Sequence, residues 1–572
     1  MEIKLNDRTL NWSVKKIGVV GPGIVGMPMA ALLADARIKI GTNDPAKVVV
    51  LQRNSKTSGW KVDAINAGKS VIGGIEPGLD DIVRKNVEDG ILSASHDFND
   101  LSDADVVLVS VQTDKKGLEP DYGPMFGALE SLAEALTKKP AGNVPLIVFE
   151  STLAPSTMMT IMKPHFAKYG LEEGKDILLG NSPNRVMPGR LVERVISSDK
   201  LVGGLHPETP RMITEIYSKI VTNGKLFQTN SITAEIEKTL ENAYRDVRIA
   251  FASEIVRYCD NQDIDYYQVR NKVNEMLAQT DKASSEPNAV PTGGLLIPNI
   301  GVGGHCLPKD GILLWWRKIE SGADTSNSLI IHSRVINNAS PKESVKLAEK
   351  TFGSIKGSSV ALLGAAYRFN SEDTRNSPTL ELGKLLKGMD CEIIIHDPYV
   401  KPDDQNILKY DLEDQFTNDL SGAVKDADYI FVCTAHQYYL DHFDDILADA
   451  LFAKGLFDGC NIYHENEISK IPYAYAGIGR GTKDPSDEFV KFVYDSFMNV
   501  DKGVANELNG LIEFFNKNYA DSEFNKAQFP KVRELAHTCS TGCEIVKIAP
   551  VDGIPEYRGF SSELAKMASA AS

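Results

Sequence analysis

The sequence lacks the features of a secreted or membrane protein. Its 572 residues contain only seven cysteines, an odd number without the spacing of a disulfide framework, which fits a reducing compartment. It has no run of about 18 apolar residues that could cross a membrane. Its first residues, "MEIKLNDRTLNW", have no apolar core of the kind found in signal peptides. We therefore expect a cytoplasmic protein without a membrane span.

Positive charge is also scarce. The 62 lysines and arginines are outnumbered by 78 aspartates and glutamates, which gives a net charge of −16. This balance argues against nucleic acid or an anionic membrane surface as a partner. It does not exclude an anionic small ligand, because glycine loops and helix N-termini bind phosphate on acidic proteins as well. No metal site is expected, because "CSTGC" (539–543) is a lone cysteine pair without a histidine cluster.

The first distinctive stretch is "KKIGVVGPGIVGMPMAALLADARIKIGTND" (15–44). An apolar strand leads into a G-x-G-x-x-G loop, and a helical Met/Ala/Leu pattern follows. Gly21 permits the tight turn, Gly23 lets a pyrophosphate approach the backbone, and Gly26 lets the helix pack closely. We predict a second strand that ends at Asp44, 23 residues after Gly21, where a carboxylate would bind the ribose hydroxyls. Such a carboxylate would repel a 2′-phosphate, so the pattern favours NAD over NADP. The alternative is a glycine-rich turn without a dinucleotide.

Further apolar strands alternate with helical stretches, at 104–113, 144–152 and 176–183. This alternation predicts a parallel sheet with both faces covered. Ligands of doubly wound sheets bind at the carboxyl ends of the strands. The predicted cofactor contacts from the loop and these strand ends are Gly21, Gly23, Ile24, Val25, Gly26, Asp44, Thr113 and Thr152.

A second strand–helix series runs from "SSVALLGAAYRF" (358–369) through "CEIIIHDP" (391–398) and "DYIFVCTAH" (428–436). It has no G-x-G-x-x-G, which favours a second nucleotide of another kind. The fold class predicted is α/β, with two Rossmann-like doubly wound parallel-sheet domains, a central helical region with a long helix, and a mainly helical C-terminal extension. The domain boundaries we predict are 1–230, 231–330, 331–482 and 483–572.

The central region begins with "TAEIEKTLENAYRDVRIAFASEIVRYC" (233–259), whose apolar residues recur at helical spacing. Lys238, Asn242 and Arg245 lie on another face of this helix, at i, i+4 and i+7. They could form the floor of an anionic site, or an ordinary solvated face. In the following stretch, "NIGVGGHCLPKDG" (299–311), Cys306 is either a catalytic thiol or a small residue in a glycine-rich turn. The extension beyond 483 also has helical spacing and is expected to pack on the body or on a partner subunit.

Eight stretches occur in the order typical of one enzyme family: GPGIVG (21–26), ESTLAPST (150–157), SPNRVMPG (182–189), EKTLENAYRDVRIAFASE (237–254), GVGGHCLPKD (301–310), LLGAAYRFNSEDTRNSP (362–378), DP (397–398) and GIGRG (477–481). With them the chain resembles the UDP-glucose/GDP-mannose dehydrogenase family, the nucleotide-sugar 6-dehydrogenases, over about residues 14–482. SPNRVMPG, NAYRDVRIAFASE and His305 in GGHC resemble the branch that oxidises UDP-N-acetylhexosamines. Oxidation of UDP-glucose or GDP-mannose is the alternative, and a non-enzymatic nucleotide-sugar-binding protein is a further one.

The resemblance implies two NAD-dependent oxidations at C6 of a UDP-sugar, with Cys306 as the nucleophile that holds the aldehyde as a thiohemiacetal and then a thioester. Lys238 would stabilise the sugar oxyanion, Asn242 would orient it, and Asp310 would handle water or protons. Glu150 is a further acid/base candidate. Arg375 would reach the dinucleotide from the second αβ domain. The implied substrate contacts are Arg185, Arg245, Gly301, Gly303, Gly304, His305 and Arg368. The resemblance also implies a homodimer, or a higher homo-oligomer, through the central helices.

Three positions depart from the family pattern. Asp114 stands in "VQTDKKG", where T-P is usual, Asn184 replaces a glutamate, and Cys460 replaces an arginine that contacts the substrate phosphates. The last change places the diphosphate contacts in doubt, and Arg368 or Arg245 could replace them.

Overall fold

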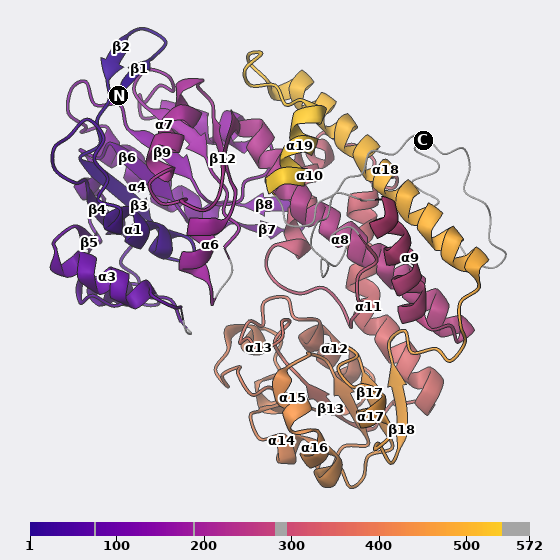
Figure 1. Ribbon diagram of the computed structural model, residues 1–572. Coiled ribbons are helices and arrows are strands. Elements are labelled where there is room, and N and C mark those ends of the chain that lie inside the picture. Colours follow the sequence, from indigo (N-terminus) through magenta and orange to yellow (C-terminus); the bar gives the residue numbers. More distant parts are fainter. Residues whose placement is uncertain (74–75, 187–188, 281–293, 540–572) are drawn as a thin grey trace. The chain divides into compact units, whose positions relative to one another are not determined.

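The structure is a computed structural model that describes residues 1–73, 76–186, 189–280 and 294–539 (Figure 1). The chain divides by its own contacts into two units. Unit 1 comprises Met1–Glu241, Leu313–Ala323 and the described part of Leu508–Thr541, and unit 2 comprises Asn242–Ile312 and Asp324–Glu507. Three helices contribute residues to both units: α8 (Ser231–Gln262), α10 (Leu307–Glu320) and α18 (Asp487–Tyr519).

Unit 1 contains an eight-stranded sheet in the order β12-β11-β10-β9-β6-β3-β4-β5. From β5 to β10 all neighbours are parallel, in the 3-2-1-4-5-6 order of dinucleotide-binding folds. The last two strands differ from the parallel prediction, because β11 runs antiparallel to β10. The strands are β3 (Lys16–Val20), β4 (Lys47–Leu51), β5 (Leu92–Ser95), β6 (Val106–Val109), β9 (Leu146–Phe149), β10 (Leu178–Asn181), β11 (Lys200–Gly204) and β12 (Leu226–Asn230). Two hairpins accompany the sheet: β1 (Glu2–Lys4) with β2 (Thr9–Asn11), and β7 (Asp114–Lys116) with β8 (Glu119–Asp121).

Helices cover both faces of this sheet because successive side chains of each strand point to opposite faces. On β9, for example, Leu146 and Val148 belong to one core, and Ile147 and Phe149 belong to the other. The first core includes α1 (Gly26–Asp35), α2 (Trp60–Asn66), α3 (Leu79–Glu88), α6 (Leu191–Ser197) and α7 (Glu208–Tyr217). The second core includes α4 (Gly123–Leu136), the π-helical turn η2 (Met158–Met162), α5 (Lys163–Ala167) and the 3-10 turn η1 (Phe98–Leu101).

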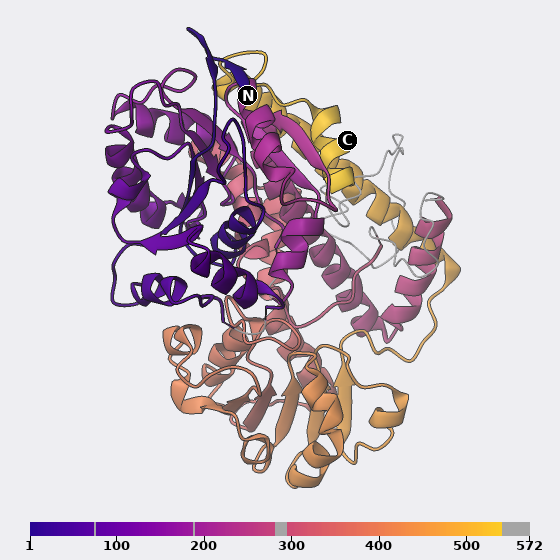
Figure 2. The same cartoon turned by 60° about the vertical axis from the view of Figure 1, so that its left-hand side comes forward.

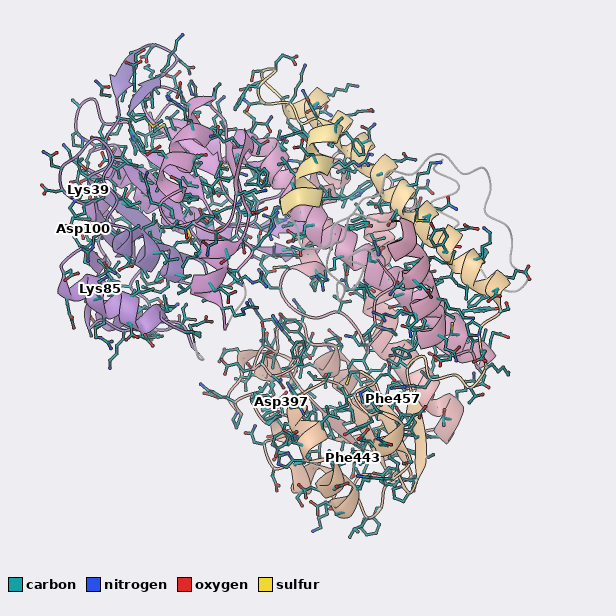
Figure 3. All side chains as sticks on the ribbon, in the orientation of Figure 1. Lys39, Lys85, Asp100, Asp397, Phe443 and Phe457 are labelled. Carbon is teal, nitrogen blue, oxygen red and sulfur yellow. The ribbon has the colours of Figure 1, made fainter. Side chains whose placement is uncertain are left out.

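Unit 2 contains a second sheet, six-stranded and wholly parallel, in the order β15-β14-β13-β16-β17-β18. It repeats the 3-2-1-4-5-6 order, and Phe457 on β17 is one of its fully buried side chains (Figure 3). The strands are β13 (Ser359–Leu363), β14 (Glu392–His396), β15 (Phe416–Thr417), β16 (Tyr429–Val432), β17 (Gly455–Asp458) and β18 (Ala474–Gly477). The helices of this region are α12 (Pro378–Lys387), α13 (Gln405–Lys409), α14 (Leu420–Val424), α15 (Gln437–Asp441), α16 (Phe443–Asp449) and α17 (Glu465–Ile468), with the 3-10 turn η3 (Glu413–Gln415).

The central helices are α8, α9 (Tyr266–Thr280), α10 and α11 (Leu329–Phe352). The predicted apolar stripe of α8 is confirmed, because its members are fully buried: Ile236, Leu240, Ala243, Val247, Ala250 and Phe251. The fold class predicted from the sequence is therefore confirmed, with two Rossmann-like sheets, a long central helix and a helical extension.

The helices of the described part of the C-terminal extension are α18 and α19 (Phe529–Cys539). In unit 2, α18 packs on α8 of the same chain, where the rings of Phe497 and Phe251 lie 5.9 Å apart and Tyr244 donates to Asp501 at 2.8 Å. Glu507 accepts the backbone N–H of Leu329 at 2.8 Å, at the start of α11. Both views show α18 beside the central helices (Figures 1 and 2). Of "CSTGC", residues 540–543 lie outside the described part of the chain.

No helix of the described residues is both long and apolar enough to cross a membrane.

Candidate active site

The predicted glycine loop joins β3 to α1 in unit 1 and has the geometry of a phosphate loop. Gly21 has a φ of +91°, and a Cβ added to Gly26 would lie 2.1 Å from the carbonyl oxygen of Gly21. A Cβ at Gly23 would meet nothing within 4 Å, so the backbone there is open to a ligand. Ile24 is 39% exposed and Val25 precedes the first turn of α1. A dinucleotide pyrophosphate therefore fits this loop, next to the helix N-terminus.

Asp44 does not lie at this loop, which corrects the prediction from spacing. The strand that pairs with β3 is β4, and it begins after Asp44, at Lys47. The stretch before β4 lies at the amino end of the sheet, where Ile40 bridges to Val14 and Lys47 N–H bonds to Lys15. A five-residue parallel strand spans about 16 Å, and Gly21 bonds to Leu51 at its far end. The Asp44 carboxylate is therefore at the wrong edge of the sheet for the ribose.

Thr113 and Thr152 are brought together at the carboxyl edge. The Thr113 hydroxyl donates to the carbonyl of Thr152 at 2.8 Å, and Thr113 is buried. The departure at Asp114 is the start of the β7–β8 hairpin, which Lys116 and Asp121 close at 3.2 Å.

Glu150, the predicted acid/base candidate, is a buried carboxylate with three hydrogen-bond partners. Its side chain is fully buried and lies 2.9 Å from Lys200 Nζ. Tyr217 and Asn184 also donate to it. Burial lowers the pKa of Lys200 and raises that of Tyr217. All oxygens of Glu150 are thus engaged inside the sheet.

Lys238 and Arg185 meet around two glutamates of α8. Arg185 Nε donates to Glu241 at 2.9 Å, its Nη2 donates to Glu237, and Lys238 Nζ lies 3.9 Å from Glu241. Burial raises the pKa of Glu237 to about 7. Arg185 is therefore held by carboxylates, and Lys238 is buried beside them rather than on a solvated face. Arg245, by contrast, is exposed.

Asn242 and Asp310 are in direct contact in unit 2. Asn242 Nδ2 donates to Asp310 Oδ2 at 2.7 Å, and Lys309 Nζ lies 2.5 Å from Asp310 Oδ1. Asp310 is fully buried, and Lys309 is 2% exposed. The ammonium of Lys309 is thus compensated by Asp310, and Asp310 fixes the orientation of the Asn242 amide.

Cys306 is exposed and immediately precedes α10. Its carbonyl accepts the N–H groups of Lys309 and Asp310, at 3.1 and 2.9 Å, so it is the N-cap residue of that helix. A helix N-terminus stabilises a thiolate. Beside the cysteine loop, burial raises the pKa of Tyr367, and the hydrogen bond to Asp373 raises the pKa of Arg375.

The glycines around Cys306 make room for neighbouring side chains. A Cβ at Gly303 would lie 2.3 Å from Tyr367, and one at Gly301 would lie 2.9 Å from Pro378. Gly304, with a φ of +89°, donates to the carbonyl of Arg375 at 2.7 Å. His305 is half-buried in the same loop.

Arg375 is also tied to Asp373 by two hydrogen bonds, of 2.8 and 2.6 Å. Arg368 is half-buried in the loop after β13, with its guanidinium 5.6 Å from the Phe369 ring. Cys460 is half-buried behind β17, and burial raises its pKa well above the ordinary value. Cys259, Cys391 and Cys433 are buried core residues, as predicted.

Three features of these sites were missed from the sequence. The pairing of Glu241 with Lys238 could have been predicted from their i, i+3 spacing. The strand β4 could have been predicted from its run of apolar residues, KVVVL. The packing of Tyr367 over the cysteine loop has no local signal, because 60 residues separate them.

Comparison with known proteins agrees with this arrangement. Models of the UDP-glucose/GDP-mannose dehydrogenase family match residues 15–221 (NAD binding domain), 232–339 (central domain) and 361–465 (UDP binding domain). UDP-N-acetyl-D-mannosamine dehydrogenase from Pyrococcus horikoshii is 29% identical over 470 residues, which cover 82% of this chain and 99% of that protein.

Among solved structures, NDP-N-acetyl-D-galactosaminuronic acid dehydrogenase from Methanosarcina mazei is 31% identical, with a TM-score of 0.68, and the match covers 82% of this chain and 96% of that one. The UDP-glucose dehydrogenase of Pyrobaculum islandicum, 19% identical with a TM-score of 0.65, shares the fold. This chain belongs to the UDP-glucose/GDP-mannose dehydrogenase family and is an NAD-dependent nucleotide-sugar dehydrogenase that acts on a UDP-sugar.

Proposed function

We propose that the protein oxidises the C6 hydroxyl of a UDP-N-acetylhexosamine, UDP-ManNAc or UDP-GlcNAc, to the uronate, for use as a polysaccharide or glycan precursor. The observation that carries the mechanism is the placement of Cys306, which is exposed and caps α10, the helix that also carries Asp310. A thiol at this position can be a thiolate at neutral pH and can be reached by a substrate aldehyde.

The four-electron oxidation needs two hydride acceptors and one covalent attachment. NAD supplies the acceptor, one molecule for each hydride. The first transfer converts the alcohol to an aldehyde and releases a proton. The Cys306 thiolate then adds to the aldehyde carbon, and the former carbonyl oxygen takes up a proton. The resulting thiohemiacetal loses the second hydride and that proton to become a thioester. Water hydrolyses the thioester, which regenerates the thiol and releases the carboxylate.

The other side chains have supporting roles in this proposal. Lys238 stabilises negative charge on the sugar oxygen, and Asn242 donates to the same oxygen or to a water. Asp310 positions Asn242, since its carboxylate accepts the Asn242 amide and is fully buried. Arg368, beside the carboxyl edge of the second sheet, attracts the diphosphate of the UDP-sugar.

The proposed substrate branch is supported by the relatives. The Pyrococcus protein is named for UDP-N-acetyl-D-mannosamine, and the Methanosarcina protein for an N-acetyl-D-galactosaminuronic acid. SPNRVMPG and His305 support the same branch from within the sequence.

A substrate panel tests the proposal: UDP-GlcNAc, UDP-ManNAc, UDP-GalNAc, UDP-glucose and GDP-mannose, each with excess NAD. We expect two NADH per sugar with a UDP-N-acetylhexosamine. Cys306→Ser should abolish acid formation and leave UDP-sugar binding within about threefold, as measured by calorimetry. Full turnover by the serine variant would refute the thioester route, and faster oxidation of UDP-glucose or GDP-mannose would refute the branch. Binding of UDP-sugars without turnover of any would support a non-enzymatic binding protein.

Two further predictions from the sequence concern the intact protein. We propose that it forms a homodimer, which light scattering coupled to gel filtration would test. Its cytoplasmic location stays a prediction from the cysteine content.

A further inference from the structure

The carboxyl end of β4 carries positive charge and no carboxylate. Residues 45–62, "PAKVVVLQRNSKTSGWKV", contain no aspartate or glutamate. They contain four cations, of which three follow the strand: Arg53, Lys56 and Lys61. In the 3-2-1-4-5-6 sheet β4 is strand 2, whose carboxyl end meets the adenosine ribose of a bound dinucleotide.

The register of the sheet places this end of β4 at the glycine loop. Gly21 N–H donates to the carbonyl of Leu51, the last residue of β4, at 3.0 Å. Gln52 follows directly, and its side-chain amide donates to Ser58 at 2.9 Å. The position where a ribose-binding acid would stand is therefore taken by a glutamine that is turned into its own loop.

Arg53 is exposed, and its guanidinium rests on α4 in the same unit. A Cβ built on Gly127 would lie 2.6 Å from Arg53 Nη1, so a glycine at this helix position leaves room for the arginine. Within the described part of the chain, no carboxylate forms a salt bridge with Arg53. Of the neighbouring acids, Asp97 caps the η1 turn and Asp63 is exposed on α2.

Lys61 approaches the glycine loop from α2. Its Nζ lies 3.4 Å from the carbonyl oxygen of Pro22, and burial lowers its pKa. Lys56 is exposed in the turn that joins β4 to α2, where the hydroxyls of Ser55 and Ser58 are 2.7 Å apart. The segment from the end of β4 to α2, next to the glycine loop, thus supplies both cations and hydroxyls.

We propose that this chain accepts NADP⁺ in addition to NAD⁺, with the 2′-phosphate bound by Arg53 and attracted by Lys56 and Lys61. A carboxylate after strand 2 would bind the 2′-hydroxyl and repel a phosphate, whereas an arginine there accommodates it. A guanidinium also matches phosphate geometry with paired hydrogen bonds. The proposal rests on the dehydrogenase function proposed above, and it goes beyond that function by assigning the residues that select the cofactor.

Kinetics of the full-length protein with its best UDP-sugar test the proposal. We expect kcat/KM for NADP⁺ within about tenfold of that for NAD⁺. Arg53→Ala removes a charge-assisted contact and should lower kcat/KM for NADP⁺ by about 10- to 100-fold, with less than a threefold change for NAD⁺. Gln52→Asp should also lower kcat/KM for NADP⁺, because the added carboxylate would repel the 2′-phosphate. Lys39→Ala is the matched control, since this exposed cation lies in the stretch before β4 (Figure 3). This variant should keep kcat/KM for NADP⁺ and for NAD⁺ within twofold of the wild-type values.

Calorimetry with 2′,5′-ADP and with ADP tests the 2′-phosphate site independently of the proposed dehydrogenase function. Tighter binding of 2′,5′-ADP than of ADP, lost in Arg53→Ala, supports the 2′-phosphate site even if the sugar substrate is misassigned. Equal or weaker binding of 2′,5′-ADP, or turnover with NADP⁺ below about one-thousandth of that with NAD⁺, overturns the proposal. Turnover with NAD⁺ in that case leaves the proposed dehydrogenase function intact.

Discussion

Replacing Asp310 with asparagine removes one charge from a buried ion pair beside the proposed nucleophile. The side chains of Lys309 and Asp310 are 3% and 0% exposed, and Nζ and Oδ1 lie 2.5 Å apart. Removing one partner of such a pair costs about 3–5 kcal/mol, because the other charge stays desolvated. At about 1.4 kcal/mol per factor of ten, the folding equilibrium should shift by at least about 100-fold. Asn242 loses its carboxylate acceptor in the same variant.

The fluorescence of Trp315 and Trp316 reports this loss locally, because both are buried on α10, the helix that carries Asp310. Urea unfolding of Asp310→Asn should therefore show a lower midpoint by fluorescence. The double variant Lys309→Met, Asp310→Asn has no buried charge in the pair and should recover most of the stability.

The kcat of the double variant then distinguishes a structural role of Asp310 from a role in catalysis. If Asp310 positions Asn242 during turnover, the double variant should keep a kcat at least tenfold below that of the wild type while it regains stability. Full activity of the double variant would refute the positioning role. A loss of stability below about 1 kcal/mol in Asp310→Asn would refute the reasoning about the ion pair.

The remaining predictions concern other parts of the chain. Asp44→Asn should change KM for NAD⁺ less than twofold, since Asp44 is at the amino end of the sheet; a tenfold rise in steady-state assays would contradict the observed register. Iodoacetamide should label Cys306 first among the five cysteines whose side chains the structure describes, and should inactivate the enzyme, because burial raises the thiol pKa of Cys433 to about 12; mass spectrometry of labelled peptides would show another site if this is wrong. Burial raises the pKa of Glu235 to about 8, above its unfolded value, so the folded state keeps a proton that the unfolded state has lost. Stability of the wild type should therefore fall as pH rises from about 4.5 to 8, by at most about 1.4 kcal/mol per pH unit, and Glu235→Gln should lack this fall in urea titrations.

The features predicted well from the sequence are those with a local physical signature. The Gly21–Gly26 loop needs small residues at fixed spacing, and the buried stripe of α8 follows from a helical period. Both depend on residues within a turn or two of each other, so no knowledge of the tertiary fold was needed. The two sheets followed from the alternation of strands and helices for the same reason.

The contacts of the charged residues could not be predicted, because their partners are distant in sequence. Glu150 follows the end of a strand, where ligands bind in such sheets, and it accepts hydrogen bonds from Lys200 and Tyr217, which are 50 and 67 residues away. Arg185 likewise pairs with glutamates of α8 more than 50 residues later. Whether a charge is a ligand or a structural partner depends on which other charge the fold brings to it.

Asp44 shows how a spacing rule can fail although the fold is right. The rule assumes that strand 2 follows the first helix after a short turn, so that an acid about 20 residues on stands at its carboxyl end. Here 11 residues lie between the end of α1 at Asp35 and the start of β4 at Lys47. This longer connection moves Asp44 to the opposite edge and places Gln52, followed by Arg53, at the carboxyl end of β4. A change in one connection therefore leaves the sheet order unchanged, but it removes the carboxylate from the end of strand 2 and leaves a glutamine there with an arginine beside it.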